Sequence, residues 1–416
     1  SMTDVYDGGI SVKIENDNIQ ELQVISGTFN AEYGKALTGV VNMVTKDGGN
    51  KLEGFVNIYA GDHTTNDSLF PNINSYTLSN DVSLSANLNG PIIPNLLTFF
   101  SSGRINKSDG WLNGLQTFTM YGDTVFNDAN KNGYRDDDEN LITPYYKTMN
   151  WYDSWSTQNK FTIRLSPTTK LKFNSIINSG QSQGFDHNRR MVQEGRNAQY
   201  NRGPFYGINL SHSFSSRSFF ELNTNQFSHR FESYLYEDPL DPRYITPDSL
   251  YWAHIEGTLP TNIATEYGQE VNYFPQYTLD RWGVETGRYN RETTTQSLKL
   301  DYTNQINKYN QIKAGFNLSI HQLSLDSYSL MDSSQADQIF TPIIPEVGSY
   351  NRSTYKFKPE EWSFYIQDKI EYGDMIINLG LRYETFNPKS NVPNNIHEPY
   401  INDPRNPALD TLSMEE

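Results

Sequence analysis

The chain has 416 residues and a formal net charge of −16, and 36% of its residues are hydrophobic, 13% aromatic and 20% charged. This acidic balance argues against nucleic acid as a partner, because phosphate binding needs clustered Lys and Arg. The chain has no cysteine, which excludes disulfides, thiolate catalysis and Cys-ligated zinc. No apolar run of about 18 residues occurs, so no transmembrane helix is expected, whereas the alternating strands of a membrane barrel would keep the mean hydropathy low.

Residues 1–50 combine short β-type runs with glycine turns. Strands are predicted at Ile19–Ile25 and Val40–Val44, and turns at Glu32-Tyr33-Gly34 and Asp47-Gly48-Gly49. A piece of this size is too small to bury a core by itself. We therefore expect a small α+β unit that depends on the rest of the chain.

From Lys51 onwards the chain shows long runs in which apolar and polar residues alternate. In Gln311–His321, the apolar residues fall on one face and the polar residues, with Gly315, on the other. Met375–Glu384 and the run around Phe161 repeat the pattern. A period of two over such lengths predicts strands rather than helices. One strand departs from it, because Asp368 shares a face with Trp362, Phe364, Ile366 and Ile370, so on a lipid-facing surface it should lie near the membrane interface.

The connections between the strands alternate between short and long. Short links are expected at 91–95, 167–168, 215–216, 307–308 and 373–374, and long ones at about 111–153, 182–202, 237–291 and 329–359. Outer-membrane barrels sort their loops in this way, whereas a Tyr-rich soluble sandwich has no reason to. The pattern predicts about eleven strands, at 51–62, 76–91, 96–110, 154–166, 169–181, 203–215, 216–236, 292–306, 309–328, 360–372 and 375–387.

Several motifs resemble those of one protein family. Phe29-Asn30-Ala31-Glu32-Tyr33-Gly34, Gly39–Lys46 and Gly48-Gly49 resemble the end of the plug domain of TonB-dependent outer-membrane receptors, and Asn89-Gly90-Pro91-Ile92 resembles their first periplasmic hairpin. Phe364–Lys369 and Asn378–Tyr383 are similar to later barrel strands of the group with an N-terminal carboxypeptidase-regulatory-like domain.

This resemblance implies an all-β fold: a partial antiparallel transmembrane β-barrel of about 11 strands, preceded by the C-terminal part of a small α+β plug. Residues 1–50 would end the plug, and residues 51–416 would form the N-terminal half of the barrel with long extracellular loops. An odd strand number and a C-terminus, Leu412–Glu416, without the terminal aromatic of such barrels favour an internal fragment, because single-chain bacterial barrels have even strand numbers.

The resemblance also implies a function and a location. Such a protein sits in the bacterial outer membrane, in contact with lipid and lipopolysaccharide. It binds an imported ligand at loops and plug and contacts the TonB machinery through an N-terminal part that is missing here. The ligand stays open between peptide, glycan and metal chelate. The alternatives are a non-transporting barrel or adhesin with calcium-stabilised binding loops, and a secreted β-rich enzyme.

One segment matches the twelve-residue calcium loop D-x-[DN]-x-[DN]-G-x5-E. Gly133 allows the sharp turn, and oxygens at alternate positions point inward to the cation. No apolar run at helical spacing flanks it, so we expect a calcium loop inside the long 111–153 connection, the alternative being a solvated acidic loop. The predicted ligands are Asp128, Asn130, Asn132, Tyr134, Asp136 and Glu139.

No catalytic site is expected. Gly180-Gln181-Ser182-Gln183-Gly184 matches G-x-S-x-G, but a nucleophile elbow needs a strand, a strained turn and a following helix, and no helix start follows here. The seven histidines form neither H-x-x-x-H nor H-E-x-x-H, which argues against zinc.

The loop over 237–291 is rich in aromatic residues, and loops longer than about 15 residues are usually functional or disordered. Its flat aromatic surfaces would suit sugar or peptide faces, or would pack the loop against its neighbours. Arg189 and Arg190, with Arg196, would bind an anionic ligand or lipopolysaccharide phosphate, or pair with carboxylates nearby. The candidate ligand contacts are Trp252, Tyr267, Tyr273, Trp282, Arg189 and Arg190.

Overall fold

The computed structural model describes residues 4–6, 8–9, 11–26, 30–34, 39–121, 125, 127, 140–247, 279–280, 283–333 and 338–390. This part of the chain is built of strands and two 3-10 turns, η1 (Asn16–Asn18) and η2 (Pro242–Tyr244). None of its helices is long and apolar enough to cross a bilayer.

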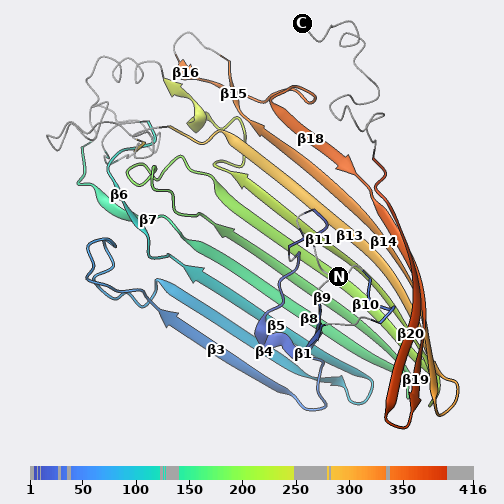
Figure 1. Ribbon diagram of the computed structural model, residues 1–416. Helices are drawn as coiled ribbons and strands as arrows, with labels where there is room; N and C mark the ends of the chain where they lie inside the picture. Colours follow the sequence, from blue (N-terminus) through green and yellow to red (C-terminus); the bar gives the residue numbers. More distant parts are fainter. Residues whose placement is uncertain are drawn as a thin grey trace, which may run out of the picture.

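One large antiparallel sheet dominates the structure, and it is curved and open (Figure 1). Its order is β20-β19-β14-β13-β11-β10-β9-β8-β5-β4-β3, so neighbours in space are successive long strands of the chain. The eleven strands are β3 (Glu53–Gly61), β4 (Asp81–Ile93), β5 (Leu97–Ser108), β8 (Tyr152–Ser166), β9 (Thr169–Ser182), β10 (Ala198–Ser215), β11 (Ser218–Tyr234), β13 (Gly287–Gln305), β14 (Asn310–Ser329), β19 (Glu360–Tyr372) and β20 (Met375–Asn387).

These strands confirm the eleven predicted from alternation. A twelfth, β18 (Arg352–Phe357), also joins the sheet: it pairs with the outer part of β14, while β19 pairs with the inner part. β18 and β19 therefore lie end to end beside β14, and Lys358-Pro359 separates them. Proline has no N–H to donate to the neighbouring strand. Smaller strands are β1 (Ile19–Ser26), β2 (Gly39–Thr45), β6 (Asn113–Gln116), β7 (Tyr145–Thr148), β12 (Thr246–Pro247), β15 (Met331–Asp332), β16 (Gln338–Phe340) and β17 (Pro342–Ile343).

The short links lie at one end of the sheet and the long links at the other (Figure 1); we name these the short-turn end and the long-loop end. The first short turn is tighter than predicted, because β4 continues through Pro91 to Ile93. The register shifts between Pro91 and Ile93, and such a bulge accommodates a residue without an N–H. Asn95 then takes a left-handed φ of 63° in the turn.

The two faces of the sheet differ as the alternation predicts. On β14, Lys313, Ser319 and His321 lie on the face that carries the N-terminal segment, and Ile312, Phe316 and Ile320 lie on the opposite face. We call these the polar face and the apolar face. The apolar face is open along the sheet, with Leu298, Leu300, Leu379 and Leu381 all exposed. The polar face instead holds buried Thr, Ser and Gln side chains such as Gln158 and Thr295.

Asp368 lies on the apolar face, as predicted, and near its short-turn end. It pairs with Ile312 and Leu379 across the sheet and accepts a hydrogen bond of 2.7 Å from Asn310. The rings of Tyr309 and Tyr372 lie next to this end, with their centroids 5.4 Å apart. The carboxylate and these two rings therefore lie together at the short-turn end of the apolar face.

The described residues between 4 and 50 lie across the polar face (Figure 1), and we call them the N-terminal segment. Its β1 and β2 pair only with each other in the described part of the chain. Before this pair, Val12 packs with Ile176 and Phe227 of the sheet, and all three are almost fully buried. Among the described residues before Lys51, η1 is the helical element. The short hydrophobic contact leaves most of the docking to polar groups.

Candidate functional site

Acidic groups of the N-terminal segment meet basic groups of the polar face at four places. The first joins Asp47 to two lysines of the sheet. Lys160 Nζ of β8 lies 2.5 Å from Asp47 Oδ1, and Lys172 Nζ of β9 lies 2.7 Å from Asp47 Oδ2. Lys160 also donates to the Thr45 carbonyl at 2.9 Å. The end of β2 is therefore held against two adjacent strands.

The electrostatics of Asp47 follow from this geometry. Burial alone would raise the pKa of its carboxyl, but the hydrogen bonds and charges of Lys160 and Lys172 outweigh burial and lower the pKa below 3.8. Asp47 is therefore ionised at neutral pH, and it neutralises a lysine that would otherwise be buried without a partner.

The second contact lies at η1. Arg104 of β5 donates to Glu15 at 3.1 Å and makes a second, short ion pair with Asp17. Glu15 also accepts a hydrogen bond of 3.1 Å from Ser156 of β8. The arginine thus bridges the carboxylate just before η1 and the carboxylate within it, which fixes η1 over β5 and β8.

The third contact is the most deeply buried. Asp4 is 2% exposed, and its Oδ2 lies 2.8 Å from His229 Nδ1 and 3.4 Å from Arg291 Nη2. Arg291 also stacks over the Tyr6 ring at 4.5 Å. Burial favours the neutral acid, but the hydrogen bonds from His229 and the Tyr6 amide, with the charge of Arg291, lower the pKa of Asp4.

The fourth contact involves Glu32, which lies within the motif that resembles the family. Its carboxylate forms a short ion pair with Lys313 of β14. Its amide donates to Gln367 of β19 at 3.3 Å, and Arg382 of β20 donates to the carbonyl oxygens of Ala31 and Glu32. Three successive strands of the sheet thereby hold one turn of the N-terminal segment.

Gly48 approaches the sheet so closely that a side chain would not fit. A Cβ atom there would lie 2.5 Å from the Phe99 carbonyl oxygen and 2.6 Å from its amide nitrogen. Both are backbone atoms of β5, which cannot move aside as a flexible side chain could. Residues 46–49 form no turn, in contrast to the prediction, and the bend follows at 50–51. Gly48 is instead a point of backbone contact between the segment and the sheet.

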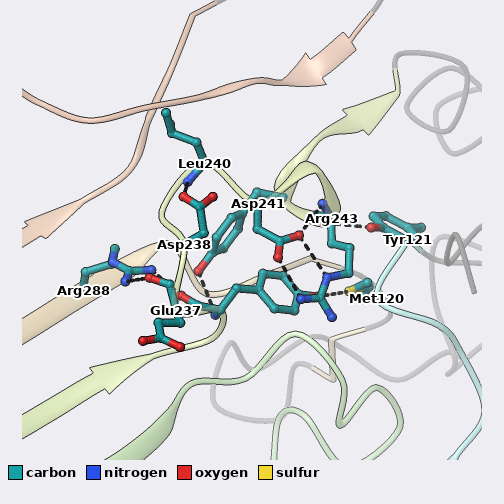
Figure 2. A network of polar contacts seen from close by, with 10 residues as sticks. Met120, Tyr121, Glu237, Asp238, Leu240, Asp241, Arg243 and Arg288 are labelled. Carbon is teal, nitrogen blue, oxygen red and sulfur yellow. Dashed lines mark hydrogen bonds and ion pairs between the residues drawn. The ribbon is translucent and has the colours of Figure 1, made fainter.

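A second polar network lies at the long-loop end, next to β12 and η2. Arg243 chelates Asp241 through Nε and Nη2 at 2.9 and 2.8 Å, and its guanidinium lies 3.8 Å over the Tyr236 ring. Figure 2 shows this pair between Tyr121 and Arg288. Tyr121 donates to the Arg243 carbonyl at 2.7 Å, and Arg288 donates to the carbonyls of Tyr236 and Glu237 at 2.5 and 2.6 Å. Burial raises the pKa of Tyr236 to about 12, although Arg243 opposes the shift.

The long loops are also hydrogen-bonded to one another. The Thr117 amide donates to the Met191 carbonyl, and the Gly283 amide donates to the Met120 carbonyl at 2.7 Å. Arg189 donates to the Gly283 carbonyl at 2.6 Å and pairs with Asp280 at 3.1 Å. Arg189 thus links two loops and is paired with a carboxylate. Arg190 is exposed.

The other predicted site residues lie outside the described residues. This holds for the calcium ligands Asp128, Asn130, Asn132, Tyr134, Asp136 and Glu139, and for Trp252, Tyr267, Tyr273 and Trp282. Within the described part of the chain, no three His, Asp or Glu side chains are grouped to hold a metal. The calcium and aromatic-contact hypotheses therefore stay predictions.

The G-x-S-x-G match does not form a nucleophile elbow. Gln181 and Ser182 belong to β9, which runs antiparallel to both β8 and β10. After Ser182 the chain continues as a loop through Gly184 without a helix. The strained turn from a parallel strand to a helix that exposes a catalytic serine is therefore missing at this position.

No protein-family model matches the sequence, and no curated protein matches it either. Solved structures do match. The outer membrane transporter YddB of Escherichia coli superimposes with a TM-score of 0.56 at 10% identity, over 93% of this chain and 46% of that one. The ferric citrate transporter FecA gives a TM-score of 0.54 at 12% identity, over 90% and 44%. FpvA of Pseudomonas aeruginosa, in complex with a pyoverdine, gives 0.53 at 12% identity, over 92% and 44%.

The chain spans less than half the length of these neighbours. It has the fold of part of a TonB-dependent outer-membrane receptor, as the motifs predicted. At the level of the fold this also confirms the predicted partial antiparallel barrel.

Proposed function

We propose that the whole protein containing this chain is an importer of the bacterial outer membrane that is energised through TonB. In this proposal residues 1–50 are the end of the plug, and residues 51–416 are the first half of the barrel. The long-loop end faces outward and binds the ligand together with the plug. The neighbours named as a ferric citrate transporter and as a pyoverdine receptor support transport rather than catalysis.

The docking of the N-terminal segment is the observation that carries this proposal. A segment that closed a pore permanently would best be held by a continuous apolar interface. Here the hydrophobic contact is small, and four clusters of ion pairs hold the rest, at Asp47, Glu15 with Asp17, Asp4 and Glu32. When such a buried pair separates, water solvates both charges again and offsets most of the lost attraction, which suits a plug that must move for passage.

The test places the whole protein in an outer membrane and follows the uptake of isotope-labelled medium solutes. Uptake of at least one solute should require both this protein and a functional TonB. A protein that binds the same solutes without TonB-dependent entry would instead support the alternative, a non-transporting barrel or adhesin.

We further propose that residues 128–139 bind calcium and that the apolar face contacts outer-membrane lipid and lipopolysaccharide. The calcium loop would lie in the connection whose base is fixed by described contacts. Tyr121 bonds to the Arg243 carbonyl, and the Val125 amide donates to the Thr117 carbonyl at 3.0 Å. A cation bound between these points and β7 would stiffen loops already joined to their neighbours.

A further inference from the structure

An open pocket lies on the polar face at the long-loop end, and none of the motifs accounts for it. Its volume is about 440 Å³, within the usual range for small-molecule sites. It is formed where β11, β13, β14 and β18 reach the loops. The lining residues are Asn197, Ser233, Gly287, Arg288, Tyr289, Ser327, Tyr328, Ser329, Tyr350, Asn351 and Ser353.

The pocket is lined by neutral groups that both donate and accept hydrogen bonds. Four serines, two asparagines and three tyrosines make up nine of its eleven residues, and none of the lining residues carries a carboxylate. Each hydroxyl and each amide can serve as donor and as acceptor. Such a wall matches a ligand with many hydroxyl groups, each of which also donates and accepts.

Two arginines at or next to the pocket already have partners within the protein. Arg288 is the charged lining residue, and its guanidinium donates to the carbonyls of Tyr236 and Glu237. Next to the pocket, Arg352 makes a bidentate pair with Asp326 at 2.8 and 2.7 Å. An anionic chelate or a peptide terminus would need unpaired charged partners for strong binding. The pocket therefore favours an uncharged ligand.

The rim offers an aromatic surface. Tyr350 is fully exposed, and it lies next to Asn351 in the loop that precedes β18. An aromatic face combines apolar area with a polar edge, and a sugar ring presents an apolar face of C–H groups between its hydroxyls. An exposed aromatic with no packing role in the fold is well suited to cover such a ring.

One lining residue of the pocket, Tyr289, is in contact with the N-terminal segment. Tyr289 is hydrogen-bonded through its side chain to Tyr6, and so is Tyr355. Tyr6 in turn lies under the Arg291 guanidinium, which pairs with Asp4. A ligand that contacts Tyr289 in the pocket would thus be linked through Tyr6 to the most deeply buried ion pair of the segment.

We propose that this hydroxyl- and amide-lined pocket binds an uncharged saccharide, seated at the long-loop end of β13 and β14, where Tyr289 contacts Tyr6 of the N-terminal segment. The inference rests on the proposed import function and names its substrate class. Internal peptide segments also hydrogen-bond, but they offer fewer polar groups per unit of surface than a saccharide.

The test is calorimetric titration of the whole purified protein with neutral oligosaccharides derived from glucan, xylan and mannan. A ferric hydroxamate chelate and a peptide without charged side chains serve as comparison probes. At least one oligosaccharide should bind, with an affinity that does not change between low and high salt, because no charge is neutralised.

Two variants place the binding in this pocket. Tyr350→Ala removes the exposed ring without affecting the fold and should weaken oligosaccharide binding about tenfold, because the ring would cover one face of the sugar. The double substitution of Ser327 and Ser353 by Val should weaken it at least as much. Tyr76→Ala, at another exposed tyrosine between β3 and β4, is the matched control and should bind as the parent does.

Failure of all oligosaccharides to bind would overturn the inference, and so would binding that neither variant weakens. Binding of the ferric chelate or the peptide that Tyr350→Ala abolishes would assign the pocket to another ligand class. These outcomes can be told apart from a failure of the proposed function. TonB-dependent entry of a different solute would support the import function and contradict the saccharide pocket. Saccharide binding without energised entry would support the pocket and contradict the import function.

Discussion

Lys160 of β8 and Asp47 of the N-terminal segment face each other across 113 residues of chain, with Nζ 2.5 Å from Oδ1. Lys160 is 8% exposed, so the lysine depends on this carboxylate and on the Thr45 carbonyl for its charge to be tolerated. The pair is the best-defined point at which the segment is attached to the sheet.

Lys160→Met should therefore loosen the end of β2. Asp47 keeps its ion pair with Lys172, so the docking free energy should fall by about 1–3 kcal/mol, which is less than for a buried charge left without any partner. Hydrogen exchange of the amides at 39–49 should become faster. Lys107→Met, which removes an exposed pair with Asp109, should leave this exchange unchanged; equal effects of both substitutions would contradict the attachment.

Docking of the N-terminal segment should depend on pH through its carboxylates. Asp4 and Asp47 both have a pKa lowered from 3.8 in the folded state. The contribution of these two carboxylates to the docking free energy of the segment is thus complete above pH 3.8, and it is lost as the pH falls through their folded pKa values. Protease accessibility of the segment should stay constant from neutral pH down to about pH 4 and rise below it.

The control for this pH profile is the double variant Asp4→Asn with Asp47→Asn. Its segment should be more accessible at neutral pH, and the step below about pH 4 should shrink. A release of the segment between about pH 5 and 7 in the parent would instead point to histidine and contradict the assignment to these carboxylates.

Gly48→Ala should displace the backbone at 47–49 from β5. The added methyl group would overlap the backbone of Phe99, which we expect to cost about 1–3 kcal/mol, as overpacking does in other interiors. Thermal unfolding of the purified protein measures the loss. Gly184→Ala is a matched control, because a Cβ atom there meets nothing within 4 Å; a parent-like unfolding temperature for Gly48→Ala would contradict the close approach.

Glu139→Gln should weaken calcium binding sharply, because the last position of the loop supplies both oxygens of one carboxylate. Calorimetric titration with calcium measures the change. Glu346→Gln, in a different loop near the long-loop end, is the control and should bind calcium as the parent does. Unchanged affinity after Glu139→Gln would remove the site.

The sheet was predictable from the sequence because each long strand carries its own alternating pattern. Gln311–His321 and Met375–Glu384 assign their faces without any knowledge of their neighbours, and the short links at 167–168 and 373–374 show which strands are adjacent. β18 was missed because it is short, lies inside a long link and is separated from β19 by Lys358-Pro359.

The attachment of the N-terminal segment was not predictable in the same way. Lys160, Lys313 and Arg382 could be placed on the polar face, and Glu32 in a turn. Which acid meets which base depends on how the segment crosses the sheet, and a single sequence carries no signal for that path. The pocket was missed for a similar reason, since its serines come from β11, β14 and β18 and its asparagines from the residues just before β10 and β18, and all of them resemble ordinary polar positions.

The central claim is that the apolar face meets hydrocarbon and the polar face meets water or the segment. The chain has no cysteine, so single cysteines at successive positions of β14, from Ile312 to Ile320, can carry spin labels in the protein reconstituted into bilayers. Labels at 312, 314, 316, 318 and 320 should be relaxed by oxygen dissolved in the lipid. Labels at 313, 315, 317 and 319 should be relaxed by a water-soluble paramagnet where the polar face meets water, and by neither reagent where the segment covers that face. The opposite alternation, or none along this strand, would contradict a membrane barrel.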